Sequence, residues 1–225
     1  MSLADHQALI ASLVPDAVDG LSQADRDQAL AAAVSRYSQD RPRDSYETVV
    51  AAEAGAFLQL PDGWATQYSK LKNIERPIGE APPRYLSSEA WSLTLTALGQ
   101  RIWLETPALT GEEIGVVFTA PHAVDAGEDT VPQSDRVAVA CFAASLLCEQ
   151  LATLTAGQGA PTIEADSVDY GAKSTSFASR ARKFAERYYN HLGIEPKRNV
   201  AAGTVVVPRE RDSRGEPRLF KGRRA

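Results

Sequence analysis

Residues 136–157, RVAVACFAASLLCEQLATLTAG, predict the helix on which the rest of the chain packs. Apolar residues recur there every three or four positions, as on one face of a helix, and Gly157 is a typical helix end. The stripe consists of Val137, Ala140, Cys141, Ala144, Leu147, Cys148, Leu151 and Leu154. The longest apolar run, Val137 to Leu147, is shorter than the ~20 residues of a membrane span. We therefore expect a core helix and no membrane contact.

Three further helices are predicted. Ser2 and Asp5 have the spacing of a helix start, and Pro15 ends the apolar run that follows. Ser22 and Asp25 repeat this signal, and the second helix should end near Ser38 because a proline follows at position 42. The last helix is predicted over 174–192. Its inner face should carry Phe177, Ala181, Phe184 and Tyr188, and its outer face Arg180, Arg182, Lys183 and Arg187.

From about Tyr46 the helical period gives way to alternation, which is typical of strands. Residues 91–95 and 101–105 predict a strand, a turn and a second strand, and 114–118 a third. Weaker strands are expected at 48–51, 57–60 and 71–75, with a loop at 77–83. The prediction is an α+β fold with a helical core (1–45 and 122–196), an inserted small antiparallel β unit (46–121) and an extended C-terminal arm (197–225).

The cysteines and histidines indicate no metal site. Cys141 and Cys148 would lie ~10 Å apart along one helix, which is too far for a disulfide. Buried thiols and a reducing compartment fit this spacing. The three histidines fall in different predicted elements, and no Cys or His pair has the close spacing of zinc ligands. We expect no metal, no cofactor and, because the N-terminus MSLADHQ lacks a basic segment before an apolar one, no signal peptide.

His122 is the one histidine in the position of an active-site loop, directly after a strand. A hydrolase would need it to meet Asp166 or Asp169, and the sequence shows no pocket that would bring them together. The simpler interpretation is a loop histidine bonded to nearby backbone. The acidic residues Asp125 to Asp129 lack the order of a calcium loop, and we expect them to be solvated. The sequence therefore favours a protein that is not an enzyme.

The last 29 residues differ from the rest in charge. They carry nine Lys or Arg against three Asp or Glu, while the preceding residues carry fifteen against twenty-six. Extended at ~3.3 Å per residue, the arm could reach on the order of 90 Å, more than twice the ~40 Å diameter expected of the rest. Its expected contact residues are Thr204, Val205, Val206, Val207, Arg209, Arg211, Arg214, Arg218, Leu219 and Phe220.

Three uses of this arm remain open. Its valine run could add a strand to the sheet edge of a partner protein, with the arginines paired to carboxylates. Its net positive charge could instead bind nucleic acid phosphates, although the acidic body opposes this. It could also be a disordered solubilising terminus. The length of the arm and its valine run favour the first use, docking on a partner protein.

Several local strings carry a resemblance to a known family. In order they are Asp25 to Asp27, Arg36 to Pro42, Leu60 to Trp64, Ile74 to Pro77, Thr119 to His122 and Ala165 to Asp169. Together with the order of the predicted elements, they resemble head-to-tail connector proteins (adaptor or head-completion proteins) of tailed phages and prophages. The resemblance covers residues 21–193.

This resemblance implies a structural protein of the virion neck, assembled in the host cytoplasm. Such proteins form closed rings, usually of twelve subunits, that sit below the portal, prolong the DNA channel and support the next neck or tail protein. The arm would then dock on the portal. An acidic body would repel phosphates, so DNA would pass without sequence-specific binding. A ring contact needs two complementary faces, which we expect from Arg180, Lys183 and Arg187 on one side and Asp125 and Asp129 on the other.

Overall fold

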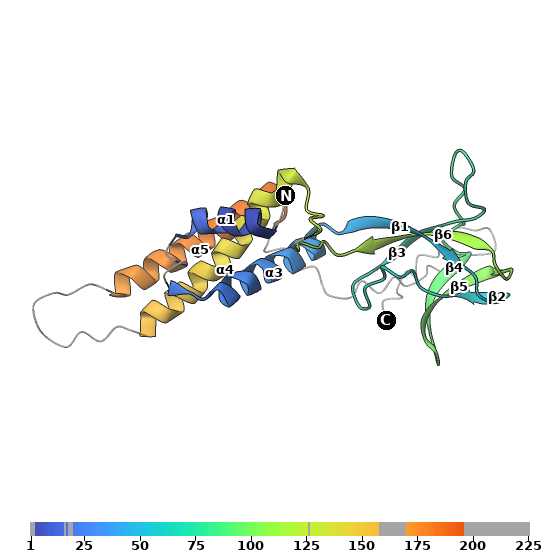
Figure 1. Cartoon of the computed structure of the whole chain (residues 1–225), viewed down its shortest axis with the longest axis horizontal. Helices are drawn as coiled ribbons and strands as arrows, with labels where there is room; N and C mark the ends of the chain where they lie inside the picture. The colour runs from blue at the N-terminus through green and yellow to red at the C-terminus, as the bar shows by residue number, and fades with distance from the viewer. Residues whose placement is uncertain (1–2, 16, 18–19, 126, 158–169, 196–225) are drawn as a thin grey trace, which may run out of the picture. The chain divides into compact units, whose positions relative to one another are not determined.

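The computed structural model describes residues 3–15, 17, 20–125, 127–157 and 170–195. Residues 1–193 form one compact unit. Within the described residues, four helices pack together and six strands form two small antiparallel sheets, which confirms the α+β prediction (Figure 1). The arm residues from Thr204 to Phe220, like Asp166 and Asp169, lie outside the described residues.

The helices follow the sequence signals closely. Their bounds are α1 Leu3–Leu13, α3 Gln23–Asp40, α4 Arg136–Gly157 and α5 Tyr170–Leu192, with a short 3-10 turn η1 Gln133–Asp135 before α4. At the start of α3, the Asp25 amide donates to the Ser22 hydroxyl at 3.2 Å and the Ser22 amide to the Asp25 carboxylate at 3.0 Å. This capping box supplies partners for two amides that the helix itself leaves unpaired.

Two helices are longer than predicted. α5 begins four residues before Ser174, and α3 continues past Ser38 to Asp40. The Asp40 carboxylate accepts hydrogen bonds from Arg36 one turn earlier and from the hydroxyl of Tyr188 on α5, both at 2.8 Å. These contacts stabilise the last turn of α3, although the nearby proline at position 42 disfavours helical backbone just before it.

α4 is the central helix, because α1, α3 and α5 all pack against it. Its buried residues include Val139, Ala143 and Leu147, so it is apolar on more than the one face that the stripe predicted. Val137 and Leu154, at the two ends of that stripe, are instead 56% and 47% exposed.

The apolar run Val137–Leu147 is part of a longer apolar helix, so the length of that run alone does not decide whether the helix could span a bilayer. Among the described residues, one helix, Gln133–Ala156, is long and apolar enough by length and composition to cross a membrane, with a mean hydropathy of 1.8. Buried core helices pass the same test. The packing of α1, α3 and α5 against α4 gives its apolar composition a core role.

The inserted region forms two three-stranded sheets, where the sequence predicted a single small unit. In the first, β6 (Glu113–Ala120) lies between β1 (Arg43–Val50) and β3 (Leu71–Glu75). In the second, β5 (Gly99–Ala108) lies between β2 (Gly55–Leu58) and β4 (Trp91–Thr96). The predicted hairpin of 91–95 with 101–105 is confirmed by the register, which pairs Trp91 with Leu104 and Thr96 with Gly99.

Both sheets contribute to one apolar core. Ile102 and Leu104 of β5 and Ile114, Val116 and Phe118 of β6 are fully buried in the same cluster. The helices have a separate core, centred on α4. Each region therefore buries its own apolar surface, and the polar loop from β6 to α4 joins them.

Candidate functional site at the loop between β6 and α4

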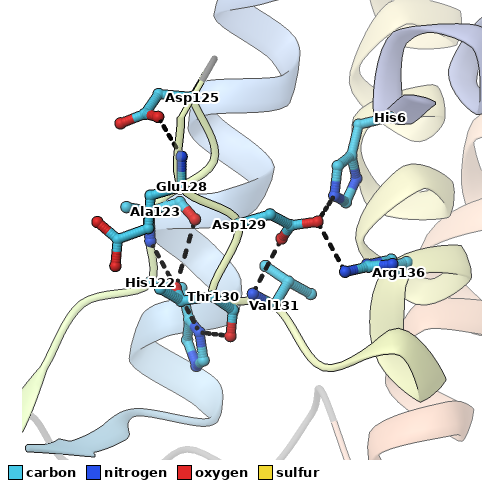
Figure 2. A network of polar contacts seen from close by, with 9 residues as sticks. All are labelled: His6, His122, Ala123, Asp125, Glu128, Asp129, Thr130, Val131 and Arg136. Atoms are coloured by element: carbon cyan, nitrogen blue, oxygen red, sulfur yellow. Dashed lines mark hydrogen bonds and ion pairs between the residues drawn. The ribbon is translucent and has the colours of Figure 1, made fainter. Parts of the chain in front are cut away.

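The loop of residues 121–132 folds back on itself through turn chemistry (Figure 2). The Asp125 amide donates to the Glu128 carbonyl at 2.9 Å, and the Thr130 amide donates to the Ala123 carbonyl at 3.0 Å. The Asp125 carboxylate accepts from the amides of Glu128 and Gly127, both at 2.7 Å. These amides lower the pKa of Asp125 below its ordinary value. Asp125 is exposed, as predicted for a surface contact.

Asp129 has the opposite environment. Its side chain is 2% exposed and accepts from Arg136 at 2.9 Å, from His6 at 3.3 Å and from the Val131 amide at 3.1 Å. Figure 2 shows the carboxylate between His6 on α1 and Arg136 at the start of α4. Asp129 therefore ties α1, the loop and α4 within its own chain, and it does not offer the exposed carboxylate that the sequence interpretation gave it.

His122 has the backbone contacts of a structural loop histidine. Its Nδ1 lies 2.9 Å from the Thr130 carbonyl and its Nε2 3.0 Å from the Arg41 carbonyl. Its amide donates to the Ser38 hydroxyl at 2.9 Å. Both ring nitrogens therefore lie within hydrogen-bonding distance of backbone carbonyls, to one of which a neutral imidazole can donate. The backbone-bonded interpretation is confirmed.

A second buried carboxylate, Asp135, was missed by the sequence analysis. It accepts from Tyr37 at 2.5 Å, from Arg41 at 2.8 Å, from Ser134 at 2.9 Å and from His191 at 3.0 Å. Burial by itself would raise the pKa of Asp135, but the hydrogen bonds and the charge of Arg41 outweigh it and lower the pKa to about 2. No spacing rule connects residues 37, 135 and 191, so no local signal could have assembled this cluster.

The cationic side chains predicted for the outer face of α5 differ in their exposure. Lys183 and Arg187 are exposed, and the Arg187 guanidinium lies 5.8 Å from the ring centre of Phe184. Arg180 is half-buried, lies 5.5 Å from the ring centre of Phe177 and donates to the Leu13 carbonyl at 3.4 Å. Within the described part of one chain, no ion pair joins these cations to Asp125.

The remaining candidates are also accounted for. Cys141 and Cys148 are thiols buried on α4, which confirms the core interpretation, and burial raises the pKa of the Cys141 thiol. Within the described ranges, no group of three or more His, Cys, Asp or Glu side chains could hold a metal ion.

The geometry defines an α+β protein with a helical bundle, two facing sheets and a polar loop between them. No family model matches the chain, and no curated protein matches it. Among solved structures it is similar to a chain of the "Neck of empty GTA particle computed with C6 symmetry". The identity is 17%, and the match covers 69% of this chain and 78% of that chain with a TM-score of 0.27. Such a low TM-score carries no functional argument.

Proposed function

We propose that this chain is a non-enzymatic head-to-tail connector in the neck of a phage-like particle. It forms a ring of about twelve subunits below a portal protein, prolongs the DNA channel and supports the next neck or tail protein. The observation that carries the proposal is the order of the elements. Among the described residues, α1 and α3 precede the six strands and α4 and α5 follow them, in the order on which the sequence resemblance to connector proteins depends.

The distribution of charge supports the same function. The residues before the arm carry fifteen Lys or Arg against twenty-six Asp or Glu. A ring of such subunits presents a negative potential to the phosphates of DNA, which moves through the channel without being held.

The subunits of the ring meet through the cationic face of α5, with Arg180, Lys183 and Arg187. The receiving side is a carboxylate surface of the next subunit. Asp125, exposed on the loop, meets this requirement, whereas the buried Asp129 holds its own subunit together.

The arm binds the portal. The segment from Thr204 to Val207 pairs with a sheet edge of the portal, the arginines at 209, 211, 214 and 218 meet its carboxylates, and Leu219 and Phe220 anchor the end. This assignment rests on the arm's length, its charge and its valine run.

Mass measurement of the full chain, alone and mixed with the portal protein of the same particle, tests the ring. We expect a closed oligomer of about twelve copies, either free or only on the portal. A chain that stays monomeric under both conditions would overturn the proposal.

Two variants test the arm. Deletion of residues 199–225 should abolish portal binding, with circular dichroism and thermal unfolding showing a folded body. Leu219→Ser with Phe220→Ser, in the full chain, should weaken binding at least tenfold. Normal portal binding by both variants would exclude the arm model. Tight binding of the full chain to duplex DNA, falling steeply with salt, would instead favour a nucleic-acid-binding accessory protein.

A further inference from the structure

A groove of about 730 Å³ runs between α3 and α4 on the surface of the helical bundle. Ala29, Ala32, Leu146 and Leu154 contribute an apolar floor, and Asp25 and Glu149 contribute carboxylates. Neither Lys nor Arg lines it within the described residues. Its chemistry is therefore apolar at the base and negative at the rim.

The groove extends to the C-terminal part of α4, with Leu146, Glu149 and Leu154 in its lining. Leu154 is 47% exposed there, although its predicted place was in the buried stripe. Glu149 is exposed, and its carboxylate makes no ion pair with another described residue. The groove therefore places an exposed leucine and a carboxylate without an ion pair among the described residues on one surface, open to a partner that carries apolar and cationic groups.

α5 carries a matching surface. Arg182, Lys183 and Arg187 are exposed on it, with Glu186 as the one acidic residue among them. From Arg180 to Arg187 the helix rises about 11 Å, and from Leu146 to Leu154 the groove side of α4 rises about 12 Å. Long cationic side chains can lay their aliphatic stems on apolar surface while their charged ends reach carboxylates.

We propose that the groove between α3 and α4 receives the cationic face of α5 from a second copy of the chain. The stems of Arg182 and Lys183 cover Leu146 and Leu154, and their charges meet Glu149 and Asp25. The inference rests on the proposed ring and names the surface that closes it. The groove and the α5 face are different surfaces of one subunit. Each subunit can therefore place its α5 face in the groove of one neighbour and accept the α5 face of the other neighbour in its own groove, as a closed ring requires.

The groove fits this role better than the Asp125 loop does. The Asp125 carboxylate already accepts two backbone amides, both at 2.7 Å. The neighbouring carboxylate of Asp129 is buried in its own ion pairs. Asp25 is likewise engaged, since its carboxylate accepts the amide and the hydroxyl of Ser22 in the capping box. The groove differs from the loop in offering a second, exposed carboxylate, Glu149, beside an apolar floor.

A charge exchange in the full chain tests the contact. Glu149→Lys alone and Lys183→Glu alone should each weaken self-association at least tenfold, measured by sedimentation or native mass with and without portal. The double variant should return to within about threefold of the original, because the pair is restored with its sign reversed. Glu149→Gln controls for loss of the charge alone, and Asp125→Lys is the matched reversal at the other exposed carboxylate. Thermal unfolding establishes that each variant is folded.

A cross-linking experiment does not depend on the charge variants. Glu149→Cys and Lys183→Cys are prepared separately and mixed under oxidising conditions, so that any disulfide between these sites joins two copies. We expect dimers and higher species in the mixture and far fewer in either variant alone. The native cysteines are both buried and should contribute little.

The outcomes separate the two proposals. Rescue of Lys183→Glu by Asp125→Lys, and not by Glu149→Lys, would overturn the groove assignment and leave the ring intact. If deletion of residues 199–225 abolished self-association and neither charge variant affected it, the groove assignment would be overturned, and the arm would be the segment that binds the groove. A monomer under every condition, portal included, would overturn the ring itself.

Discussion

The hydroxyl of Tyr37 donates a 2.5 Å hydrogen bond to the carboxylate of Asp135, 98 residues further along the chain. Both residues are buried, at 0% and 2% exposed. Because Asp135 also accepts from Arg41 and His191, a single carboxylate joins α3, the turn before α4 and α5. Asp135 therefore links three segments of the helical region that are distant in sequence.

Replacing Asp135 should change the acid stability of the protein. Its pKa of about 2 in the folded protein lies below its ordinary value. The ionised carboxylate therefore stabilises the fold at neutral pH by on the order of 2 kcal/mol, and this contribution is lost as the pH falls from about 4 to about 2. In urea unfolding, Asp135→Asn should be less stable than the original at pH 7, and the difference should shrink towards pH 2. A difference that stays constant with pH would contradict this account.

Asp129 and Asp125 form a matched pair of substitutions in one loop. Asp129→Asn leaves the buried Arg136 without its charged partner, so we expect a loss of about 3 kcal/mol in the free energy of unfolding. Asp125→Asn keeps the side-chain oxygen that accepts the two amides and should change stability by less than about 0.5 kcal/mol. Denaturant unfolding at pH 7 measures both. Equal effects would mean that Asp129 is not the tie between α1 and α4.

The cap of α3 can be tested at Ser22. Ser22→Ala removes the hydroxyl that accepts from the Asp25 amide and should cost about 1 kcal/mol. Ser22→Asp should retain most of the stability, since an aspartate also caps a helix start. If alanine and aspartate gave the same unfolding midpoint as serine, the capping box would contribute nothing to stability.

Two leucines of the β4–β5 hairpin allow a core position to be compared with a surface position. Leu104 is fully buried between the two sheets, whereas Leu95 is 80% exposed. Leu104→Ala should cost about 2–5 kcal/mol through lost burial and the cavity left behind. Leu95→Ala should stay within about 0.5 kcal/mol. A large loss at Leu95 in the isolated chain would mean that another part of the protein covers it.

The sequence was a good guide wherever the determining signal was local. The Ser22 and Asp25 spacing located the start of α3, and the 71–75 strand was placed at its correct bounds, because caps and alternation act over a few residues. The hairpin of β4 and β5 was found for the same reason. Strand bounds were less accurate at Arg43, because the more buried positions at the start of β1 hold polar residues, Arg43, Ser45 and Glu47, so the residue types do not show the alternation in burial.

Long-range contacts were not predictable. Alternation shows which face of a strand is buried but not which strand lies beside it. The sequence therefore predicted one small β unit where the structure has two sheets. Asp129 and Asp125 are both acidic loop residues, yet the side chain of Asp129 is buried because His6 of α1, 123 residues away in sequence, packs against it beside Arg136 of α4. The same limit hid the partners of Asp135. The site residues in the arm remain a prediction.

The packing of α1, α3 and α5 against α4 has a consequence for synthesis. α1 and α3 emerge from the ribosome long before α4 and α5, so their apolar faces stay uncovered until those helices are made. The contact between Asp40 of α3 and Tyr188 of α5 spans 148 residues. The strands from β1 to β6 lie between them and can pair among themselves in the meantime. Closing such distant contacts costs chain entropy and slows folding. Nascent chains halted before α4 should therefore depend on chaperones to protect α1 and α3.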